Sequence, residues 1–268
     1  MPLKYSATTV FLPHLTLSET AKTLRQHGYN GVELRVRYYT GDPSAAPSGW
    51  GRHVTDVSPD NVVARASEIR DAFAAEGIAI AGFASNASAA DLETVRKLAA
   101  GAAACGCPAI RLVAPRGYDG KFSYQEGYGE AVRAYAQALA ITRDHGIKVW
   151  IELHGGTLFV SASLAHRLLC NFNASEIGAI YDPQNMCMDG FETTPLALDL
   201  LGDYVAHVHA GSRKPVPGPV DAKGTTKWQW VTCPMGEGLY DHTKLLAELV
   251  RRHYPHFITL EDFDDKRS

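Results

Sequence analysis

Four side chains in the sequence have the types and spacing needed to bind one divalent metal ion: Glu152, Asp182, His209 and Glu261. Each stands at the end of a short apolar run typical of a β-strand, and consecutive members are separated by one strand–helix unit, or by one unit plus a long insertion. Three carboxylates and one imidazole form an oxygen-rich donor set, which suits Mn²⁺ or Mg²⁺ and tolerates Co²⁺ or Zn²⁺. The sequence therefore predicts one divalent metal ion as cofactor. The alternative, four separate ion pairs, is less favoured because the four positions are equivalent.

The elements that must position these residues alternate between strand and helix along the whole chain, which predicts a parallel sheet built from βαβ units. The predicted strands cover residues 5–11, 31–36, 78–83, 109–113, 148–154, 179–182, 205–210 and 257–261. The predicted helices lie near residues 18–27, 60–76, 91–104, 124–145, 161–170, 194–201 and 241–252.

The length of 268 residues, 46% of them hydrophobic, fits one (β/α)8 barrel but also two domains of about 130 residues each. The unbroken alternation favours an α/β fold with a single TIM barrel domain over residues 1–268. Few residues follow the last predicted strand, so we expect the final helix to be absent or degenerate. An N-terminal segment or a second subunit could then cover that side of the barrel, and a homo-oligomer is an open possibility.

Charged side chains recur on one face of the predicted strands, opposite the apolar side chains that face the helices. They are Glu33, Arg35, Arg37, Arg111, Glu152, His154, His207 and His209. In a barrel this second face points to the interior, where charge is costly unless it is paired or bound to a metal. Arg111, Arg35 and Glu33 are thus candidates to bind hydroxyl, carboxylate or phosphate groups of a substrate, although Arg35 and Glu33 could instead form an ion pair.

Two connections, residues 37–59 and 211–238, are longer than usual and follow predicted strands. In a barrel such connections lie on the rim that carries the active site, so we expect them to form its walls or lid. The second contains Lys214, a further candidate substrate contact, and Trp228 and Trp230, which could shield a sugar face or pack under the loop. The alternative is that both are surface insertions.

Composition excludes several classes of protein. With 26 basic and 29 acidic side chains, the chain lacks the charge needed to bind nucleic acid through its phosphates, so a small-molecule partner is favoured. Its five cysteines are scattered, which favours free thiols in a reducing compartment, and Cys105 with Cys107 makes a weak zinc motif. The sequence shows neither a signal peptide nor a membrane span, and we expect a cytoplasmic protein without a membrane partner.

Several segments resemble the xylose isomerase-like TIM barrels, a superfamily that includes sugar isomerases and epimerases, inosose-processing enzymes, 3-dehydroshikimate dehydratases and AP endonuclease family 2 proteins. The segments are HGYNGVELR (27–35), WIELHGG (150–156), AIYDPQN (179–185), VAHVHAGS (205–212), MGEGLYDHTKLLAEL (235–249) and ITLEDF (258–263). Their order and spacing together are specific to the superfamily, but they do not indicate a substrate.

The resemblance implies roles for several residues. Glu152, Asp182, His209 and Glu261 match the metal ligands of the family, and His207, one layer deeper on the same face, is then a supporting or core residue. His154 matches a position that often lines the substrate pocket, with a structural histidine as the alternative, and Gln184 in AIYDPQN is a further candidate substrate contact. Many relatives have Lys and Asp after the strand-seven histidine. Here Ala210, Gly211 and Ser212 follow it, and basic side chains come only at Arg213 and Lys214.

The implied activity is a metal-dependent isomerase or epimerase of a sugar or sugar-like keto-polyol, with Glu152 and Glu261 as the catalytic acid and base and an enediolate intermediate. The main alternative is a dehydratase of an inosose or of 3-dehydroshikimate, which begins with the same proton abstraction. An abasic-site endonuclease is less favoured, because the third strand ends in AGFASN without a histidine. A sugar-binding scaffold without catalysis is also less favoured, because both carboxylates are present.

Overall fold

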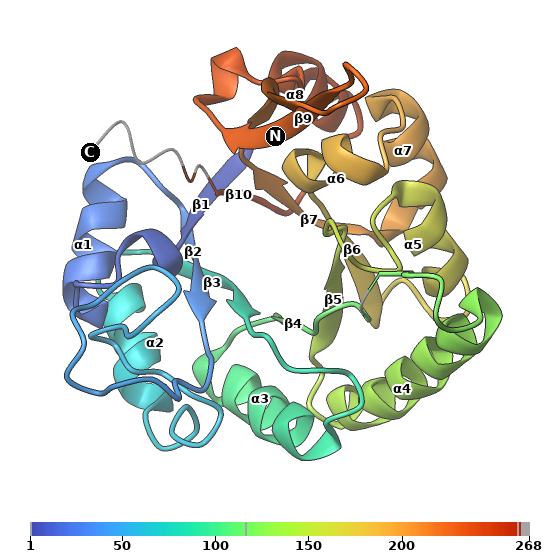
Figure 1. Cartoon of the computed structure of the whole chain (residues 1–268). Helices are drawn as coiled ribbons and strands as arrows, with labels where there is room; N and C mark the ends of the chain where they lie inside the picture. The colour runs from blue at the N-terminus through green and yellow to red at the C-terminus, as the bar shows by residue number, and fades with distance from the viewer. Residues whose placement is uncertain (1, 116, 262, 264–268) are drawn as a thin grey trace.

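A computed structural model describes residues 2–115, 117–261 and 263 (Figure 1). Eight parallel strands form a closed barrel in the spatial order β1-β10-β7-β6-β5-β4-β3-β2, and helices surround it. The barrel strands are β1 (Lys4–Thr8), β2 (Gly31–Arg35), β3 (Ala79–Ala84), β4 (Ala109–Arg111), β5 (Lys148–Glu152), β6 (Ile177–Tyr181), β7 (Val205–Ala210) and β10 (Phe257–Leu260). The predicted single α/β barrel is confirmed, and each predicted strand corresponds to one strand of the barrel.

The helices between the strands agree with the predicted ones except for one addition. They are α1 (Leu17–Gln26), α2 (Ala66–Ala74), α3 (Leu92–Cys105), α4 (Tyr124–Asp144), α5 (Ala162–Leu169), α6 (Pro183–Asp189), α7 (Thr194–Leu201) and α8 (His242–Arg251). The short helix α6 was not predicted. We expected the final helix, after the last strand, to be absent or degenerate. That expectation concerns mainly residues 262 and 264–268, which lie outside the described residues.

Local sequence signals explain where the helices begin and end. Thr16 and Glu19 form a reciprocal capping box at the start of α1, and Gly106 ends α3 with a φ of 71°, a left-handed conformation that favours glycine. Helix α6 begins directly at the end of β6, because the Asp182 side chain accepts a hydrogen bond from the backbone N–H of Asn185 and Pro183 occupies the first helical position. None of the helices in the described ranges combines the length and hydropathy needed to cross a bilayer.

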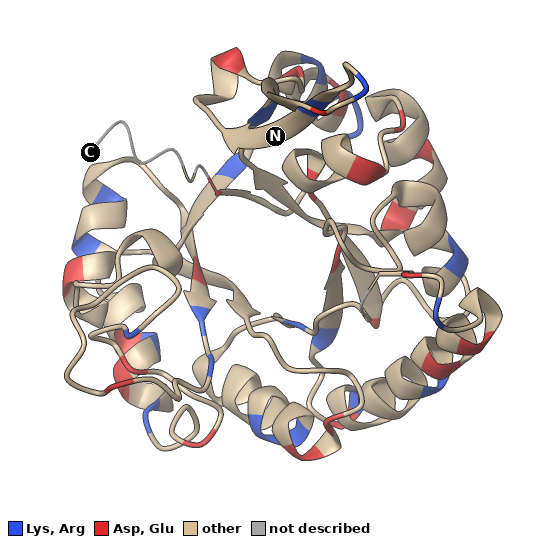
Figure 2. Ribbon diagram, in the orientation of Figure 1, with Lys and Arg blue, Asp and Glu red and all other residues tan. Residues whose placement is uncertain are grey.

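Two apolar regions stabilise the barrel. The larger one lies between the strands and the helices and includes the outward side chains Val32, Leu34 and Ile151. The smaller one fills the barrel interior with Ala109, Trp150, Ile180 and Ala206. Charged residues lie mostly on the outer helices and loops, with a few on the barrel strands (Figure 2).

Trp150 closes the floor of the barrel. Its ring stacks on His207 with the centroids 4.3 Å apart, and it occupies the space that a Cβ atom would need at Gly82. Polar side chains nearer the C-terminal ends of the strands are therefore held above a closed floor, away from the opposite end of the barrel.

The connection after β7 forms an antiparallel hairpin, β8 (Arg213–Val220) and β9 (Thr226–Thr232), which was not predicted as strands. The connection after β2 reaches α2 largely without regular secondary structure. Both lie at the end of the barrel where the parallel strands terminate.

Candidate metal centre and active site

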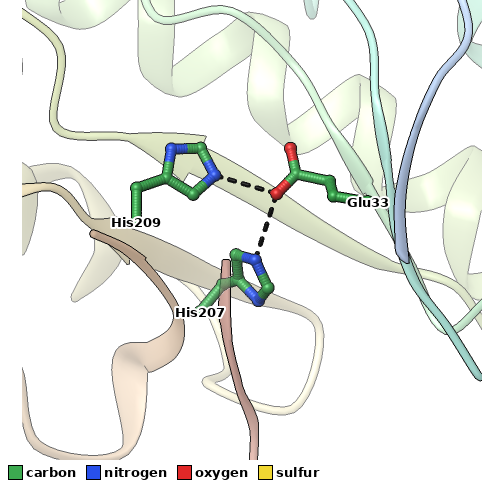
Figure 3. A group of neighbouring side chains, drawn as sticks. All are labelled: Glu33, His207 and His209. Atoms are coloured by element: carbon green, nitrogen blue, oxygen red, sulfur yellow. Dashed lines mark hydrogen bonds and ion pairs between the residues drawn. The ribbon is translucent and has the colours of Figure 1, made fainter. Parts of the chain in front are cut away.

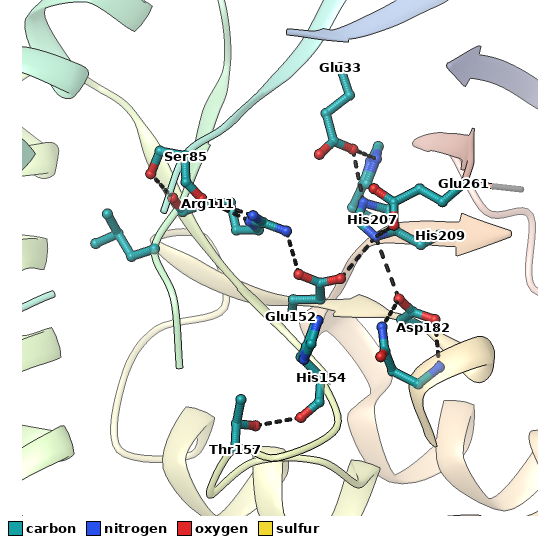
Figure 4. A network of polar contacts seen from close by, with 12 residues as sticks. Glu33, Ser85, Arg111, Glu152, His154, Thr157, Asp182, His207, His209 and Glu261 are labelled. Carbon is teal, nitrogen blue, oxygen red and sulfur yellow. Dashed lines mark hydrogen bonds and ion pairs between the residues drawn. The ribbon is translucent and has the colours of Figure 1, made fainter. Parts of the chain in front are cut away.

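The four predicted metal ligands converge at one point of the barrel mouth (Figure 4). Glu152 ends β5, while Asp182, His209 and Glu261 lie at the ends of β6, β7 and β10. All four side chains are buried, and each offers a ligand atom within 4.8 Å of the others. The structure thus brings together residues from four separate strands, as their equivalent positions predicted.

His209 is oriented by a buried carboxylate, that of Glu33, beside its ring (Figure 3). Its Nε2 donates to Oε2 of Glu33 at 2.9 Å. Because Nε2 carries this proton, Nδ1 is free to present a lone pair on the other side of the ring. Nδ1 is buried, has no hydrogen-bond partner among the described residues, and faces the three carboxylates.

The donor set fits a divalent cation. The Nδ1 atom of His209 lies 3.3 Å from Glu152, 3.7 Å from Asp182 and 3.2 Å from Glu261, measured to carboxylate oxygens. Burial alone would lower the pKa of His209, but Glu261, Glu33 and the other carboxylates raise it well above its usual value. A cluster that draws a proton to its centre so strongly would also be stabilised by a metal ion in the place of that proton.

The two predicted catalytic carboxylates differ in their surroundings. Burial would raise the pKa of Glu152, but Arg111 and His209 outweigh it and hold the pKa well below its usual value. Nη1 of Arg111 donates to Oε2 of Glu152, while Oε1 faces His209. Burial raises the pKa of Glu261, and His209 is its sole ion-pair partner in the described chain. Glu261 is thus the better base of the pair.

Arg111 and Asp182 are each fixed by neighbouring polar groups. Nε and Nη2 of Arg111 both donate to the carbonyl oxygen of Ser85 at 3.0 Å, which leaves Nη1 for Glu152. Asp182 accepts from the backbone N–H of Asn185 at 3.0 Å and from its side-chain amide at 2.6 Å. These contacts restrict the carboxylates of Glu152 and Asp182 to orientations that face His209.

His207 lies one layer below His209, as its position in the strand predicted. Its Nε2 donates to Glu33 at 3.1 Å and contacts the hydroxyl of Thr259 at 2.7 Å. Burial lowers the pKa of His207, so its ring remains neutral between Glu33 and the stacked Trp150. Glu33 therefore connects both histidines.

A pocket of about 470 Å³ opens above the four ligands, and Glu152 and Glu261 lie in its wall. Three of the predicted substrate contacts also line it: Arg111, His154 and Gln184. His154 is held by a hydrogen bond from Nδ1 to the carbonyl oxygen of Gly155 at 2.7 Å. This volume is within the range of small-molecule sites.

The other three predicted substrate contacts lie elsewhere. Glu33 is fully buried beneath His209 and does not line the pocket. Arg35 is buried and donates to the carbonyl oxygen of Gly51 at 3.0 Å, so it and Glu33 have separate partners. Lys214 pairs with Glu237 at 2.9 Å on the hairpin side. The pocket thus brings together part of the predicted set.

The further lining residues include four that the sequence did not mark as candidate substrate contacts: Arg37, Trp50, Asn185 and Arg213. Arg37 shares the inner face of its strand with Glu33 and Arg35, a signal that could have identified it. Arg37 and Trp50 come from the first long connection, and Arg213 comes from the second, so both connections contribute to the walls as expected. Trp228 and Trp230 do not line this pocket.

Comparisons with solved structures agree with the fold. The 3-keto-D-glucoside 4-epimerase YcjR from E. coli superposes with a TM-score of 0.71 at 13% identity, covering 97% of this chain and 92% of that one. AsbF from Bacillus anthracis, described as a probable 3-DHS dehydratase, has a TM-score of 0.72 at 19% identity, covering 98% and 94%. The zinc-bound IOLI protein has a TM-score of 0.71 at 14% identity, covering 97% and 89%.

Sequence comparisons establish the family. A search of curated proteins gives no match. The family model described as xylose isomerase-like TIM barrel matches residues 21–268, which is most of the chain and includes all four clustered ligands. The chain therefore belongs to the xylose isomerase-like TIM barrel family.

Proposed function

We propose that the protein is a divalent-metal-dependent isomerase or epimerase that moves a proton on a carbon next to the carbonyl of a sugar or keto-polyol. The observation that carries the proposal is the convergence of Glu152, Asp182, His209 and Glu261 below a sugar-sized pocket. The family and the structurally similar sugar epimerases support this class of reaction, and Mn²⁺ or Mg²⁺ is the preferred ion because the donor set is rich in carboxylates.

The chemistry divides between the ion and the chain's own residues. A bound dication polarises the carbonyl and makes the neighbouring C–H more acidic. Glu261 then accepts the proton, because its carboxylate faces the pocket and has a raised pKa. Glu152 returns a proton less readily while Arg111 stabilises its anion, so its role is to hold the substrate and ion in place and to act as the weaker acid–base partner.

Epimerisation and isomerisation differ in where the proton returns. Delivery from Glu152 to the opposite face of the same carbon gives an epimer, whereas delivery by Glu261 to the neighbouring carbon interconverts an aldose and a ketose. Arg111, His154, Gln184 and the newly identified Asn185 line the pocket and can bind the substrate hydroxyls in either case.

A dehydratase of a cyclic keto-polyol is the second candidate. It is favoured by the arginines that line the pocket, which would suit a carboxylate on the ring, and by the similarity in fold to AsbF. Both reactions start with proton removal by Glu261, and the fate of the substrate distinguishes them.

A single experiment tests both candidates. The metal-loaded protein is incubated in deuterated water with a panel of ketoses, inososes and 3-dehydroshikimate, and the products are followed by NMR. The proposed function predicts deuterium at the carbon next to the carbonyl together with an isomer or epimer, whereas loss of water with a new double bond indicates the dehydratase. If no compound of the panel exchanges a carbon-bound proton with any of the divalent metal ions loaded, the proposal is wrong.

A further inference from the structure

The wall of the pocket contains an arginine, Arg37, that forms no direct ion pair with a carboxylate of the described residues. Arg37 follows β2, and its Nε atom is buried without a hydrogen-bond partner in the described chain. By contrast, Arg35 donates to Gly51 and Arg111 donates to Ser85 and Glu152.

The guanidinium of Arg37 lies over an aromatic ring. Its guanidinium carbon lies 5.6 Å from the centroid of the Trp50 ring, and the Trp50 ring contacts that of Phe263 at 5.3 Å. Trp50 and Phe263 both line the pocket. A guanidinium above an aromatic face gains a cation–π attraction while its N–H groups remain donors, so the pocket wall offers a donor fork to an anion.

The charges around Arg37 are predominantly positive, which favours binding of an anion beside it. The pKa of Arg37 is lowered to about 10, mainly by burial. The positive charges of Arg111 and Arg35 add to the lowering, and the carboxylates of Glu152 and Glu261 reverse only part of it. Three arginines line the pocket, namely Arg37, Arg111 and Arg213, opposite the three carboxylates of the candidate metal centre. With the adjoining buried Glu33 and Arg35 included, four carboxylates face four arginines. A dication that replaces the proton drawn to His209 therefore leaves an excess of two positive charges, which a neutral sugar cannot offset.

We infer that the substrate is anionic and that the guanidinium of Arg37 binds its carboxylate or phosphate group. The inference rests on the proposed function and specifies its substrate class. The reacting carbonyl lies at the four ligands on the floor of the pocket, and the anionic group lies at the mouth beside Trp50. Arg213 on the hairpin side contacts the Met188 sulfur at 3.8 Å and adds to the positive field, but no aromatic ring of the described residues lies behind it.

The test measures affinity without turnover. Isothermal titration with Mn²⁺-loaded and with metal-free protein compares D-fructose, D-fructose 6-phosphate and quinate, which are a neutral ketose, a sugar phosphate and a polyol carboxylate. Wild-type protein is expected to bind at least one of the two anionic probes at least tenfold more tightly than fructose, and the preferred probe identifies the phosphate or the carboxylate as the group recognised.

Variants assign the effect to Arg37. Arg37→Met should weaken the preferred anionic probe at least tenfold and leave fructose unchanged, Arg37→Lys should give an intermediate loss, and the exposed Arg133→Met on α4 should match wild type. The inference is overturned if neither anionic probe binds more tightly than fructose, if Arg37→Met retains the preference, or if Arg213→Met causes the larger loss. Failure of the proposed function is separate, because it would show as no proton exchange in deuterated water while Arg37-dependent binding persists.

Discussion

At the scale of single residues, the proposed metal centre depends on a carboxylate outside the four-residue cluster. Glu33 is fully buried and accepts from Nε2 of His209 at 2.9 Å, which holds Nδ1 toward the three carboxylates. Carboxylate partners of metal-binding histidines typically contribute 10–100-fold to metal affinity. Glu33→Gln should therefore weaken Mn²⁺ binding by about 10–100-fold, measured by calorimetric titration. The exposed Glu93→Gln on α3 is the control, and unchanged affinity in Glu33→Gln would show that His209 needs no such support.

The two carboxylates proposed as catalytic, Glu152 and Glu261, should respond differently to the same substitution. Glu152→Gln leaves the buried Arg111 without its charged partner, so it should lower the free energy of unfolding of the metal-free protein by about 2 kcal/mol. Glu261→Gln removes a carboxylate that burial already disfavours, so the metal-free variant should be at least as stable as wild type. Both should abolish proton exchange. Urea denaturation and the NMR exchange assay measure the two effects, and equal stability losses would contradict the asymmetry.

The convergence of the four proposed ligands could be predicted from the sequence, whereas their neighbours could not. Each ligand ends a strand, and a closed barrel brings equivalent strand ends to one rim, so Glu152 and Asp182 were identifiable from pattern alone. Trp50 and Arg213 depend on the path of long connections, which no periodicity specifies. The inner face of β2 indicated that Glu33 points inward, but only the observed packing shows that it lies beneath His209 and not in the pocket.

At the scale of elements, the position of the site depends on how Trp150 fills the barrel. A Cβ at Gly82 on β3 would overlap the Trp150 ring, so Gly82→Ala should destabilise the protein by about 1–3 kcal/mol through overpacking. Gly129 on α4 is the matched control, because a Cβ there has only the flexible Arg133 side chain nearby, at 3.5 Å. Gly129→Ala should stabilise the helix by about 0.5–1 kcal/mol. Thermal and urea unfolding measure both, and a neutral Gly82→Ala would indicate that β3 can move away from Trp150.

The long connection after β2 contains a histidine that makes its stability depend on pH. Burial lowers the pKa of His53 to about 4, and Arg35 and Arg37 add to this, while Nε2 donates to the carbonyl oxygen of Gly49 at 2.9 Å. The unfolded chain binds a proton near pH 6.5 and the folded chain only near pH 4, so protonation favours unfolding as the pH falls between these values.

Replacing His53 should remove that contribution. His53→Gln keeps a donor for Gly49, and its free energy of unfolding should fall less than that of wild type between pH 6.5 and pH 4, by a difference of up to about 3 kcal/mol. Urea denaturation across this range measures the difference. Parallel curves for the two proteins would show that His53 is not held neutral by the fold.

Element types were easier to predict than element boundaries. Strands 31–36 and 205–210 combine an apolar face with a polar face, and both were placed within one residue of the observed β2 and β7. Helix α6 was missed because its seven residues follow β6 directly and carry no amphipathic repeat. The β8–β9 hairpin was missed because Pro215 and Pro217 interrupt its first strand, a pattern that argues against a regular strand.

At the scale of the whole molecule, the metal-free chain holds three buried carboxylates around one imidazole. Binding of a metal ion there should therefore increase the stability of the folded protein. A ligand that binds only the folded state stabilises it by about 2.7 kcal/mol at a concentration of 100 Kd, which shifts Tm by several degrees in a chain of this size. Mn²⁺ should therefore raise Tm by roughly 5–10 °C, EDTA should reverse the shift, and proton exchange should be lost and regained in parallel.

Asp182→Asn keeps the size of the side chain but removes a ligand charge, and it should lose most of the shift, whereas the exposed Asp199→Asn should keep it. Differential scanning calorimetry measures these values, and an equal shift in Asp182→Asn would place the ion outside the four-residue cluster.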